Sequence, residues 1–388
     1  MKNFIKEMMN LSFKFFNIML SRDPDLVSNQ AISPYSFSQA LGIIANGADE
    51  PMQSIFLKNL GFTNKITEYN ENSYVLYDKL ISDNKKYLND YSYKNKHLTD
   101  PRYKIEGNLR VQNFLLYDNK FTMEEKFETQ LNKFYDVKFI PFDSKNIDQA
   151  ISRLNEFVCL STDNNIKKAC ETISPNTCLL LMNVLHLDIN FSRKFYTCKD
   201  VFNSFTGTIE HDMIYNWDEY ETYEDEKKIV INNHYTYGGL SFLAVMPKDI
   251  SYWKEVSSSI SNNDELNDLM SKMEWKHLKL TFPKFEYEDE LNFSDYTRDL
   301  ELEGILNSLN LIPGVDFDNI KVKQKLYIKV NEFGTTNNNF VDHCTRRGGE
   351  LHEELKIDKP FLWYIVTNHK NESTKKIIFM GKYLHPEN

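Results

Sequence analysis

The sequence has few cysteines, and it lacks the cysteine patterns that form disulfides in small secreted domains or bind zinc. Its five cysteines are an odd number, and no two of them stand in C-x-x-C spacing. This pattern argues against a disulfide framework and against a zinc finger, so we expect free thiols in a reducing compartment. The 13 glycines form no flexible linker, and no change in composition divides the chain. We therefore predict one domain over residues 1–388.

Motifs of the common catalytic and phosphate-binding sites are also missing. The chain contains no G-x-S-x-G, no G-x-x-x-x-G-K-[ST], no G-x-G-x-x-G and no H-E-x-x-H. His352-Glu353-Glu354 is a fragment of a zinc-protease motif without its second histidine. The nine histidines are scattered, which does not favour a metal site. We predict neither an enzyme nor a protein with a metal or an organic cofactor.

The net charge of −10 and the N-terminal pattern bear on partners and location. Phosphate backbones and anionic lipids repel an acidic protein, so we expect no nucleic-acid partner and no membrane partner. The first 20 residues carry apolar side chains at helical spacing, interrupted by Lys6, Glu7 and Lys14. This predicts an amphipathic helix rather than a cleavable signal peptide. We expect a cytoplasmic protein, or one secreted without such a peptide.

Apolar periodicity places helices in the first half of the chain and strands in the second. Helical spacing predicts helices over residues 4–18, 37–47, 52–60 and 66–86. A polar stretch without periodicity predicts an exposed loop over residues 87–102. Runs typical of strands cover residues 109–117, 178–187, 240–246, 277–282, 325–330, 361–366 and 376–381. Helices followed by strands indicate an α+β fold.

The segment 217–226 is acidic with interleaved aromatic residues. It could bind a cation or a basic partner. The solvated rim of a β-hairpin is the interpretation that we favour, because charge runs of this length usually lie in water.

Several segments resemble the characteristic segments of the serpin family, and they occur in the same order along the chain. They are Asn29-Gln-Ala-Ile-Ser33-Pro34-Tyr-Ser36, Leu154-Asn155-Glu-Phe157, Asn183-Val-Leu-His186 with Phe195, Leu240–Pro247, Leu280-Thr-Phe-Pro283-Lys-Phe285, Phe361–Val366 and Phe379-Met-Gly381-Lys. In the third segment only Asn183, Leu185 and Phe195 match closely. The resemblance covers residues 29–386. It implies the serpin fold, with three β-sheets, about nine helices and an exposed reactive-centre loop over residues 334–357.

The resemblance also implies a region where the main sheet opens. Ser33 and Ser36 would lie beneath the sheet at the point where its strands part, with Asn183 and His186 nearby. The residues alone suggest plainer roles for three of these. Ser33 and Ser36 suit turn and helix capping, which is compatible with a place beneath the sheet. For His186 we favour a core histidine with a hydrogen-bonded tip.

The segment Lys329-Val-Asn-Glu332-Phe-Gly334-Thr335 resembles the hinge of the reactive loop, and Asp358-Lys-Pro360-Phe361 resembles its far anchor. The implied activity is suicide inhibition of a serine protease, which is trapped as an acyl-enzyme when the cut loop inserts into the main sheet. Counting from the hinge places the cut bond at Gly348–Gly349 or one or two residues earlier. Arginine suits the pocket of a trypsin-like protease, so we expect Arg347–Gly348 first and Arg346–Arg347 next. Both arginines could also be solvated loop charges.

The hinge departs from the family at the residues that would insert first. The implied hinge consists of Glu332, Gly334, Thr335, Thr336, Asn337, Asn338 and Asn339. Inhibitory serpins have small, alanine-rich residues where the asparagines stand, and burying an unpartnered amide costs about 1–3 kcal/mol. We therefore keep two alternatives, a non-inhibitory binding or carrier protein and an inhibitor of cysteine proteases. The expected partner of a monomeric protein is the target protease.

Overall fold

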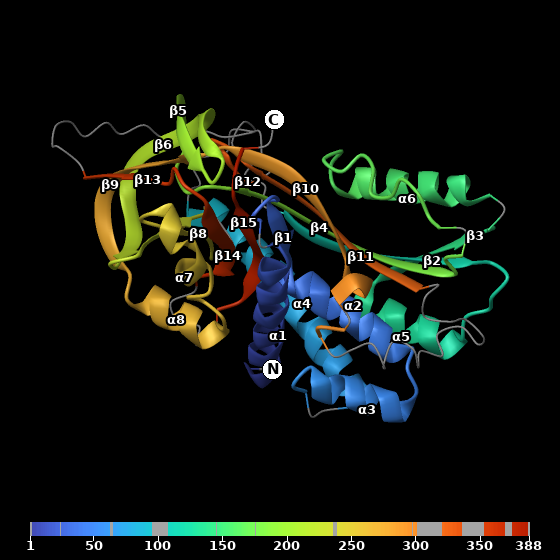
Figure 1. The fold of residues 1–388 in the computed structure, drawn as a ribbon. Coiled ribbons are helices and arrows are strands. Elements are labelled where there is room, and N and C mark those ends of the chain that lie inside the picture. The colour runs from blue at the N-terminus through green and yellow to red at the C-terminus, as the bar shows by residue number, and fades with distance from the viewer. Residues whose placement is uncertain are drawn as a thin grey trace.

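The computed structural model describes residues 2–386 except 24, 63–64, 95–107, 145, 175, 236–238, 297, 301–319, 336–352 and 369–374. Its architecture is α+β, as the sequence predicts: two β-sheets stand side by side, with helices packed on their faces (Figure 1). In the described part of the chain, no helix is both long and apolar enough to cross a membrane.

One sheet has six strands in the order β10-β11-β12-β4-β2-β3. Their bounds are β10 Phe285–Asn292, β11 Ile320–Val330, β12 Gly334–Thr335, β4 Leu179–Asn190, β2 Asn108–Asp118 and β3 Val137–Phe142. Strand β4 is buried along almost its whole length because both faces of this sheet are covered. Alternation sends Leu181 and Leu185 into the main core, and it sends Leu180 and Val184 into a second core beneath helix α6, Ile147–Ser161.

The other sheet has nine strands, with the path β1-β15-β14-β8-β7-β6-β9-β13 and β5 paired beside β6. Their bounds are β1 Gln30–Ile32, β15 Ile377–Tyr383, β14 Phe361–Thr367, β8 Leu240–Pro247, β7 Lys228–His234, β6 Gly207–Glu224, β9 Glu274–Pro283, β13 Glu353–Lys356 and β5 Tyr196–Ser204. Strand β6 has 18 residues and pairs with β5, β9 and β7 in turn. For this reason the strands outside the six-stranded sheet form one continuous sheet rather than two.

Eight α-helices lie in the described residues. Besides α6 they are α1 Lys2–Arg22, α2 Pro34–Asn46, α3 Glu50–Asn59, α4 Ile66–Lys94, α5 Glu125–Tyr135, α7 Trp253–Ser257 and α8 Asn263–Ser271, and two short 3₁₀ helices cover Ile250–Tyr252 and Phe293–Tyr296. The Ser33 side chain caps α2 by accepting a hydrogen bond from the Ser36 amide, and Pro34 follows at the first helical position. Figure 1 shows α6 on one side of the six-stranded sheet and α2 on the other.

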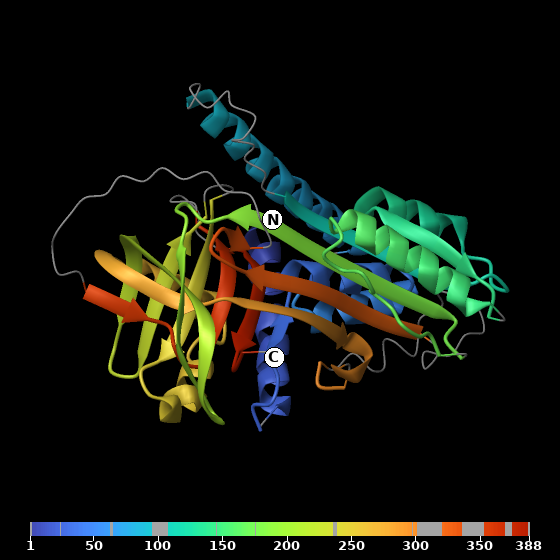
Figure 2. The ribbon, with the colours of Figure 1, turned by 90° about the horizontal axis from the view of Figure 1, so that it is seen from above.

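The predicted loop over residues 87–102 is wrong in its first half, because α4 continues to Lys94. Figure 2 shows this end of α4 projecting away from the rest of the molecule. The stretch before Pro101 contains no glycine or proline, and its lysine, leucine and tyrosine residues tolerate helical geometry. A helix that leaves the core needs no apolar stripe, which is why periodicity failed there. Residues 95–102 lie outside the described residues.

Candidate hinge and sheet-opening site

Two of the predicted hinge residues, Gly334 and Thr335, form strand β12 between β11 and β4. Thr335 lies opposite Val330 of β11 and opposite Ile189 of β4, in antiparallel register with both. Further along the sheet β4 and β11 pair directly, in parallel, and that pairing ends at Leu185 and Leu326. The six-stranded sheet is therefore parted at one end, and the hinge enters the parting.

Gly334 sits where a side chain would collide with the backbone. Its φ is +154°, and a Cβ at this position would lie 2.2 Å from the carbonyl oxygen of Ile189 and 2.7 Å from the Cα of Asn190. Backbone atoms of a central strand cannot move aside as a flexible side chain can. Only glycine lets the hinge approach β4 this closely.

Thr335 is anchored by a buried hydrogen bond. Its side chain is fully buried, and its hydroxyl lies 2.6 Å from the hydroxyl of Tyr235. The Tyr235 ring stacks on Phe191, with ring centroids 5.0 Å apart, and residues 191 and 235 also form an isolated β-bridge. Burial raises the pKa of Tyr235, so this hydroxyl stays protonated. This hydrogen bond therefore fixes the start of the loop to Tyr235, which lies where the two sheets meet.

The turn before β12 is held by Asn331 and Glu332. The Asn331 side-chain oxygen accepts hydrogen bonds from the amides of Phe333 and Gly334, at 2.9 and 3.2 Å. The Glu332 carboxylate forms a 2.7 Å ion pair with Lys284, the residue that joins β9 to β10. Burial disfavours the charge of Glu332, but the contact with Lys284 prevails and lowers the pKa of its carboxyl.

Amide side chains line the sheet below the parting. Gln324 of β11 lies opposite Asn183 of β4, which lies opposite Asn113 of β2. The Asn183 amide donates to the Asn113 side-chain oxygen at 2.6 Å, and Gln324 exchanges two 3.4 Å hydrogen bonds with the backbone of Ser33. Ser33 and Ser36 thus lie beneath the sheet, and they also form the cap of α2.

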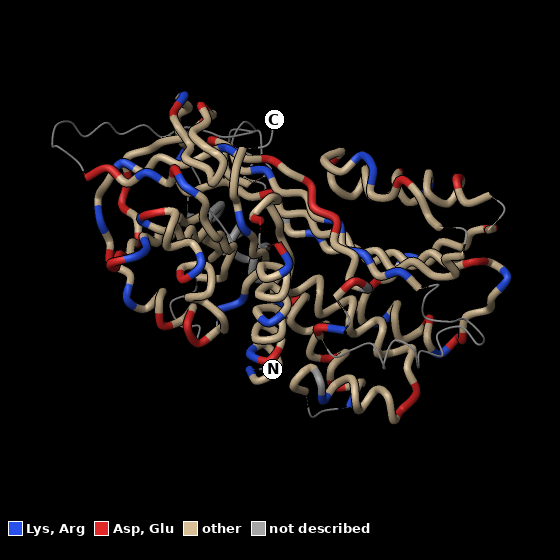
Figure 3. Tube along the Cα trace, in the orientation of Figure 1, with Lys and Arg blue, Asp and Glu red and all other residues tan. Residues whose placement is uncertain are grey.

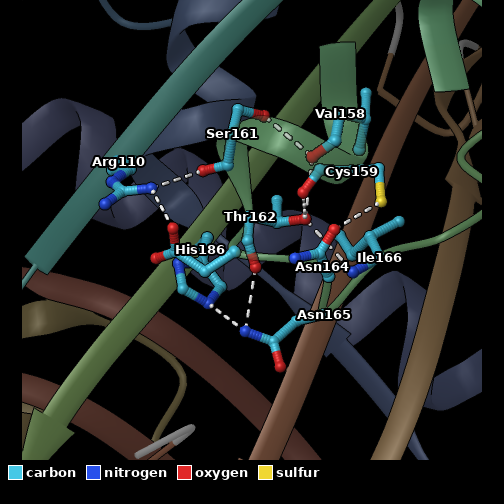
Figure 4. A network of polar contacts seen from close by, with 10 residues as sticks. Arg110, Val158, Cys159, Ser161, Thr162, Asn164, Asn165, Ile166 and His186 are labelled. Atoms are coloured by element: carbon cyan, nitrogen blue, oxygen red, sulfur yellow. Dashed lines mark hydrogen bonds and ion pairs between the residues drawn. The ribbon is translucent and has the colours of Figure 1, made fainter. Parts of the chain in front are cut away.

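His186 lies at the parting but does not join this cluster. Strand residues three apart point to opposite faces, so His186 faces α6 whereas Asn183 faces α2. The buried ring accepts a 3.0 Å hydrogen bond at Nε2 from the Asn165 side chain, which also donates to the Thr162 carbonyl (Figure 4). Burial lowers the pKa of His186 to about 4, so the ring is neutral at pH 7. It is a core histidine with a hydrogen-bonded tip, as its residue context predicts.

Hydrogen bonds and ion pairs hold the strands together on each side of the parting. They define two halves of the sheet, β2–β4 with α6 and β10–β11. In one half, Arg110 of β2 donates to the Ser161 carbonyl at 3.0 Å and pairs with Asp163, which fastens the end of α6 to the pair β2–β4. In the other half, three ion pairs join β10 to β11: Lys323–Glu290, Lys325–Glu288 and Lys329–Glu286. Figure 3 shows acidic residues along β10 beside basic residues along β11. Neither the contacts of Arg110 nor these three ion pairs connect β4 with β11.

The segment that follows α6 makes both a polar and an apolar contact with the sheet. A polar cleft of about 630 Å³ lies between residues 167–172 and the charged side chains of β10 and β11. Buried residues of the same segment, among them Ile166 and Cys170, share a core with Val184 of β4 and Tyr327 of β11. Part of the contact between the halves is therefore dry and part is open to water.

Several predicted site residues lie outside the described residues. They are Thr336, Asn337, Asn338, Asn339, Arg346, Arg347, Gly348 and Gly349. The four cysteines among the described residues are free thiols. Among the described residues, no group of three or more His, Cys, Asp or Glu side chains could hold a metal ion.

Sequence reasoning missed Tyr235, Gln324 and Asn113. Asn113 and Gln324 are polar residues within strands that carry apolar residues around them, and this is the signal that could have identified them. Tyr235 offers no such signal, because an aromatic residue near a strand end usually serves packing alone.

Known proteins resemble this chain in sequence and in fold. The family described as "Serpin (serine protease inhibitor)" matches residues 6–386. "Serine proteinase inhibitor 2" of Myxoma virus (strain Uriarra) is 26% identical over 74% of this chain and 86% of that protein. "Thyroxine-binding globulin" of Rattus norvegicus is 22% identical over 97% of this chain and 87% of that protein. The thermophilic serpin Tengpin in its native state superposes with a TM-score of 0.76, at 22% identity and over 99% of this chain and 95% of that chain.

Proposed function

The chain belongs to the serpin family, and on that premise we propose that it inhibits a serine protease of trypsin-like specificity as a suicide substrate. Serpins are mostly protease inhibitors that bind a target protease. The observation that carries the proposal is the position of β12: Gly334 and Thr335 already occupy the parted end of the six-stranded sheet. A loop that starts inside the sheet can continue into it once it is cut.

The proposed reaction uses the protease's own chemistry. The protease serine attacks the carbonyl carbon of Arg347, the bond to Gly348 breaks, and the amine of Gly348 leaves with the proton that the serine gave up. An ester then joins Arg347 to the protease. Insertion of the loop between β4 and β11 would carry the ester along the sheet and distort the protease before water hydrolyses it.

A gel assay with named proteases tests the proposal. The protein is mixed with trypsin, thrombin and plasmin, and an SDS-stable covalent complex is expected with at least one of them. Sequencing the released fragment distinguishes a cut after Arg347 from a cut after Arg346. Complete cleavage of the loop by these proteases with no complex would refute inhibition. Arg347→Ala should abolish the complex, whereas Arg346→Ala should leave most of it.

A carrier function is the second candidate, and the register of β12 gives it a specific basis. Extending the observed pairing would place Asn337 between Leu187 and Ile328, and Asn339 between Leu185 and Leu326. Both amides would face the main apolar core, at a cost of about 1–3 kcal/mol each. If insertion is slowed in this way, water hydrolyses the ester before the protease is distorted. The protein would then act as a substrate.

The thermal stability of the cut protein separates the two candidates. A large rise in the melting temperature after loop cleavage would report insertion and count against a carrier. The double variant Asn337→Ala, Asn339→Ala sharpens the comparison, because it removes the two amides and leaves the cut bond intact. If the asparagines slow insertion, this variant should divert a larger share of cleaved protein into covalent complex than the wild-type sequence does.

A further inference from the structure

An exposed aromatic surface lies on the outer face of β5, β6 and β9. Tyr196, Tyr215 and Trp217 follow one another across this face, with ring centroids 5.6 Å apart for the first pair and 5.2 Å for the second. Tyr196 and Trp217 each remain 45% exposed. Large aromatic side chains at the surface are favoured anchors for protein partners.

The rings are held in place, which suits them to binding. The Lys279 ammonium lies over both Tyr215 and Trp217, at 5.3 and 5.6 Å from the ring centroids. The same ammonium forms a 2.8 Å ion pair with Glu354 of β13. Side chains that are already ordered lose less conformational entropy when a partner binds. We call the set Tyr196, Tyr215, Trp217 and Lys279 the aromatic surface.

This surface adjoins the far end of the reactive loop. Strand β13, Glu353–Lys356, lies at the end of the range predicted for the loop, and Glu354 lies opposite Lys279 in parallel register. Lys279 in turn lies opposite Trp217. Trp217 is therefore two strands from β13, which corresponds to about 10 Å.

The size of a protease brings it over this surface. Glu354 is six residues beyond Gly348, so a fully extended chain spans about 20 Å between them. A compact domain of roughly 200 residues has a radius of gyration of about 16 Å and is about 40 Å across. A protease seated on the Arg347–Gly348 bond is therefore wide enough to reach from the loop past β13 to Trp217.

We propose that the aromatic surface is a second contact site for the target protease, used in addition to the reactive loop. This inference rests on the proposed function for the identity of the partner. The fitting partner surface presents apolar side chains to the exposed rings of Tyr196 and Trp217, because Lys276 and Lys279 already pair with Glu353 and Glu354. The net charge of −10 favours a partner of positive net charge.

The test compares rates of attack on the loop in the whole protein. The second-order rate constant is measured for the protease among trypsin, thrombin and plasmin that cleaves the wild-type loop fastest. Trp217→Ala and Tyr196→Ala should each lower it at least fivefold. Tyr74→Ala, which removes an aromatic residue that is 46% exposed on α4, should change it less than twofold. A synthetic peptide of residues 338–353 lacks the surface and should be cleaved more slowly than the whole protein.

The outcomes separate this inference from the proposed function. Cleavage without an SDS-stable complex would refute inhibition, yet the rate comparison would still decide the role of the surface. A Trp217→Ala rate within twofold of the wild-type rate would overturn the second contact site. A wild-type dimer that Trp217→Ala dissolves would overturn it too, because the surface would then serve self-association. If none of the three proteases cleaves the wild-type loop, both proposals fail.

Discussion

The hydrogen bond between Thr335 and Tyr235 should show strong energetic coupling in a double-mutant cycle. Both residues are buried, at 0% and 5% exposure, and their hydroxyl oxygens are 2.6 Å apart. Thr335→Val leaves the Tyr235 hydroxyl buried without this partner, and Tyr235→Phe does the same to Thr335. An orphaned buried hydroxyl costs about 1–3 kcal/mol, so each single variant should lower the free energy of unfolding by about 1–2 kcal/mol.

The double variant carries the decisive information. Removing both hydroxyls leaves no orphan, so its loss should be close to that of one single variant. The coupling energy should then be about 1 kcal/mol, measured by urea unfolding followed by circular dichroism. Tyr220→Phe is a matched control, because the hydroxyl of this buried tyrosine has no hydrogen-bond partner among the described residues. Additive single losses, or a Tyr235→Phe loss no larger than that of Tyr220→Phe, would refute the anchor.

Two further predictions concern the same hinge. Gly334→Ala should lower the melting temperature more than Gly207→Ala does. Both glycines have positive φ, but an added Cβ collides with backbone atoms at Gly334 and meets nothing within 4 Å at Gly207. Equal losses would mean that the positive φ alone requires a glycine at residue 334. Glu332→Gln should destabilise the protein at pH 7, where the ion pair with Lys284 is intact. Folding lowers the pKa of Glu332 from 4.5. The loss of stability in Glu332→Gln should therefore be complete above pH 4.5 and should fade as the pH falls through the folded-state pKa. A loss that persists in thermal melts at pH 2 would contradict a stabilising ion pair between Glu332 and Lys284.

The strands and the first helices could be predicted because their patterns are local. The runs at 361–366 and 240–246 became β14 and β8 with nearly the predicted bounds. The end of α4 could not be predicted, because it follows from backbone propensity in a helix without an apolar stripe. The opposite orientations of Asn183 and His186 follow from strand alternation once the strand is known, whereas the partner of each depends on distant segments.

Long-range register is the part of the site that a single sequence does not contain. That Thr335 contacts Tyr235, 100 residues away, depends on how β12 enters between β11 and β4. Gly334 was identified through resemblance, but the reason for a glycine there is a collision with Ile189 and Asn190 of another strand. No local pattern around residue 334 encodes that collision.

The two halves of the sheet and the register of β12 indicate which step decides whether the protein acts as an inhibitor or as a substrate. That step is the insertion of the first loop residues after Thr335. Opening the sheet leaves β2–β4 with α6 on one side and β10–β11 on the other, so the parting breaks the direct pairs between β4 and β11 and the packing of Tyr327 in the core beneath α6. Asn337 and Asn339 would enter within the next four residues after Thr335, before most of the new strand has formed. A penalty of about 1–3 kcal/mol per amide at this early stage slows insertion by roughly fivefold to somewhat over a hundredfold for each residue, since about 1.4 kcal/mol corresponds to a factor of ten in rate. The protease needs only to deacylate within that delay to escape. Arg347 should therefore determine whether the bond is attacked, whereas Asn337 and Asn339 should determine how the attacked protein divides between complex and cleaved product.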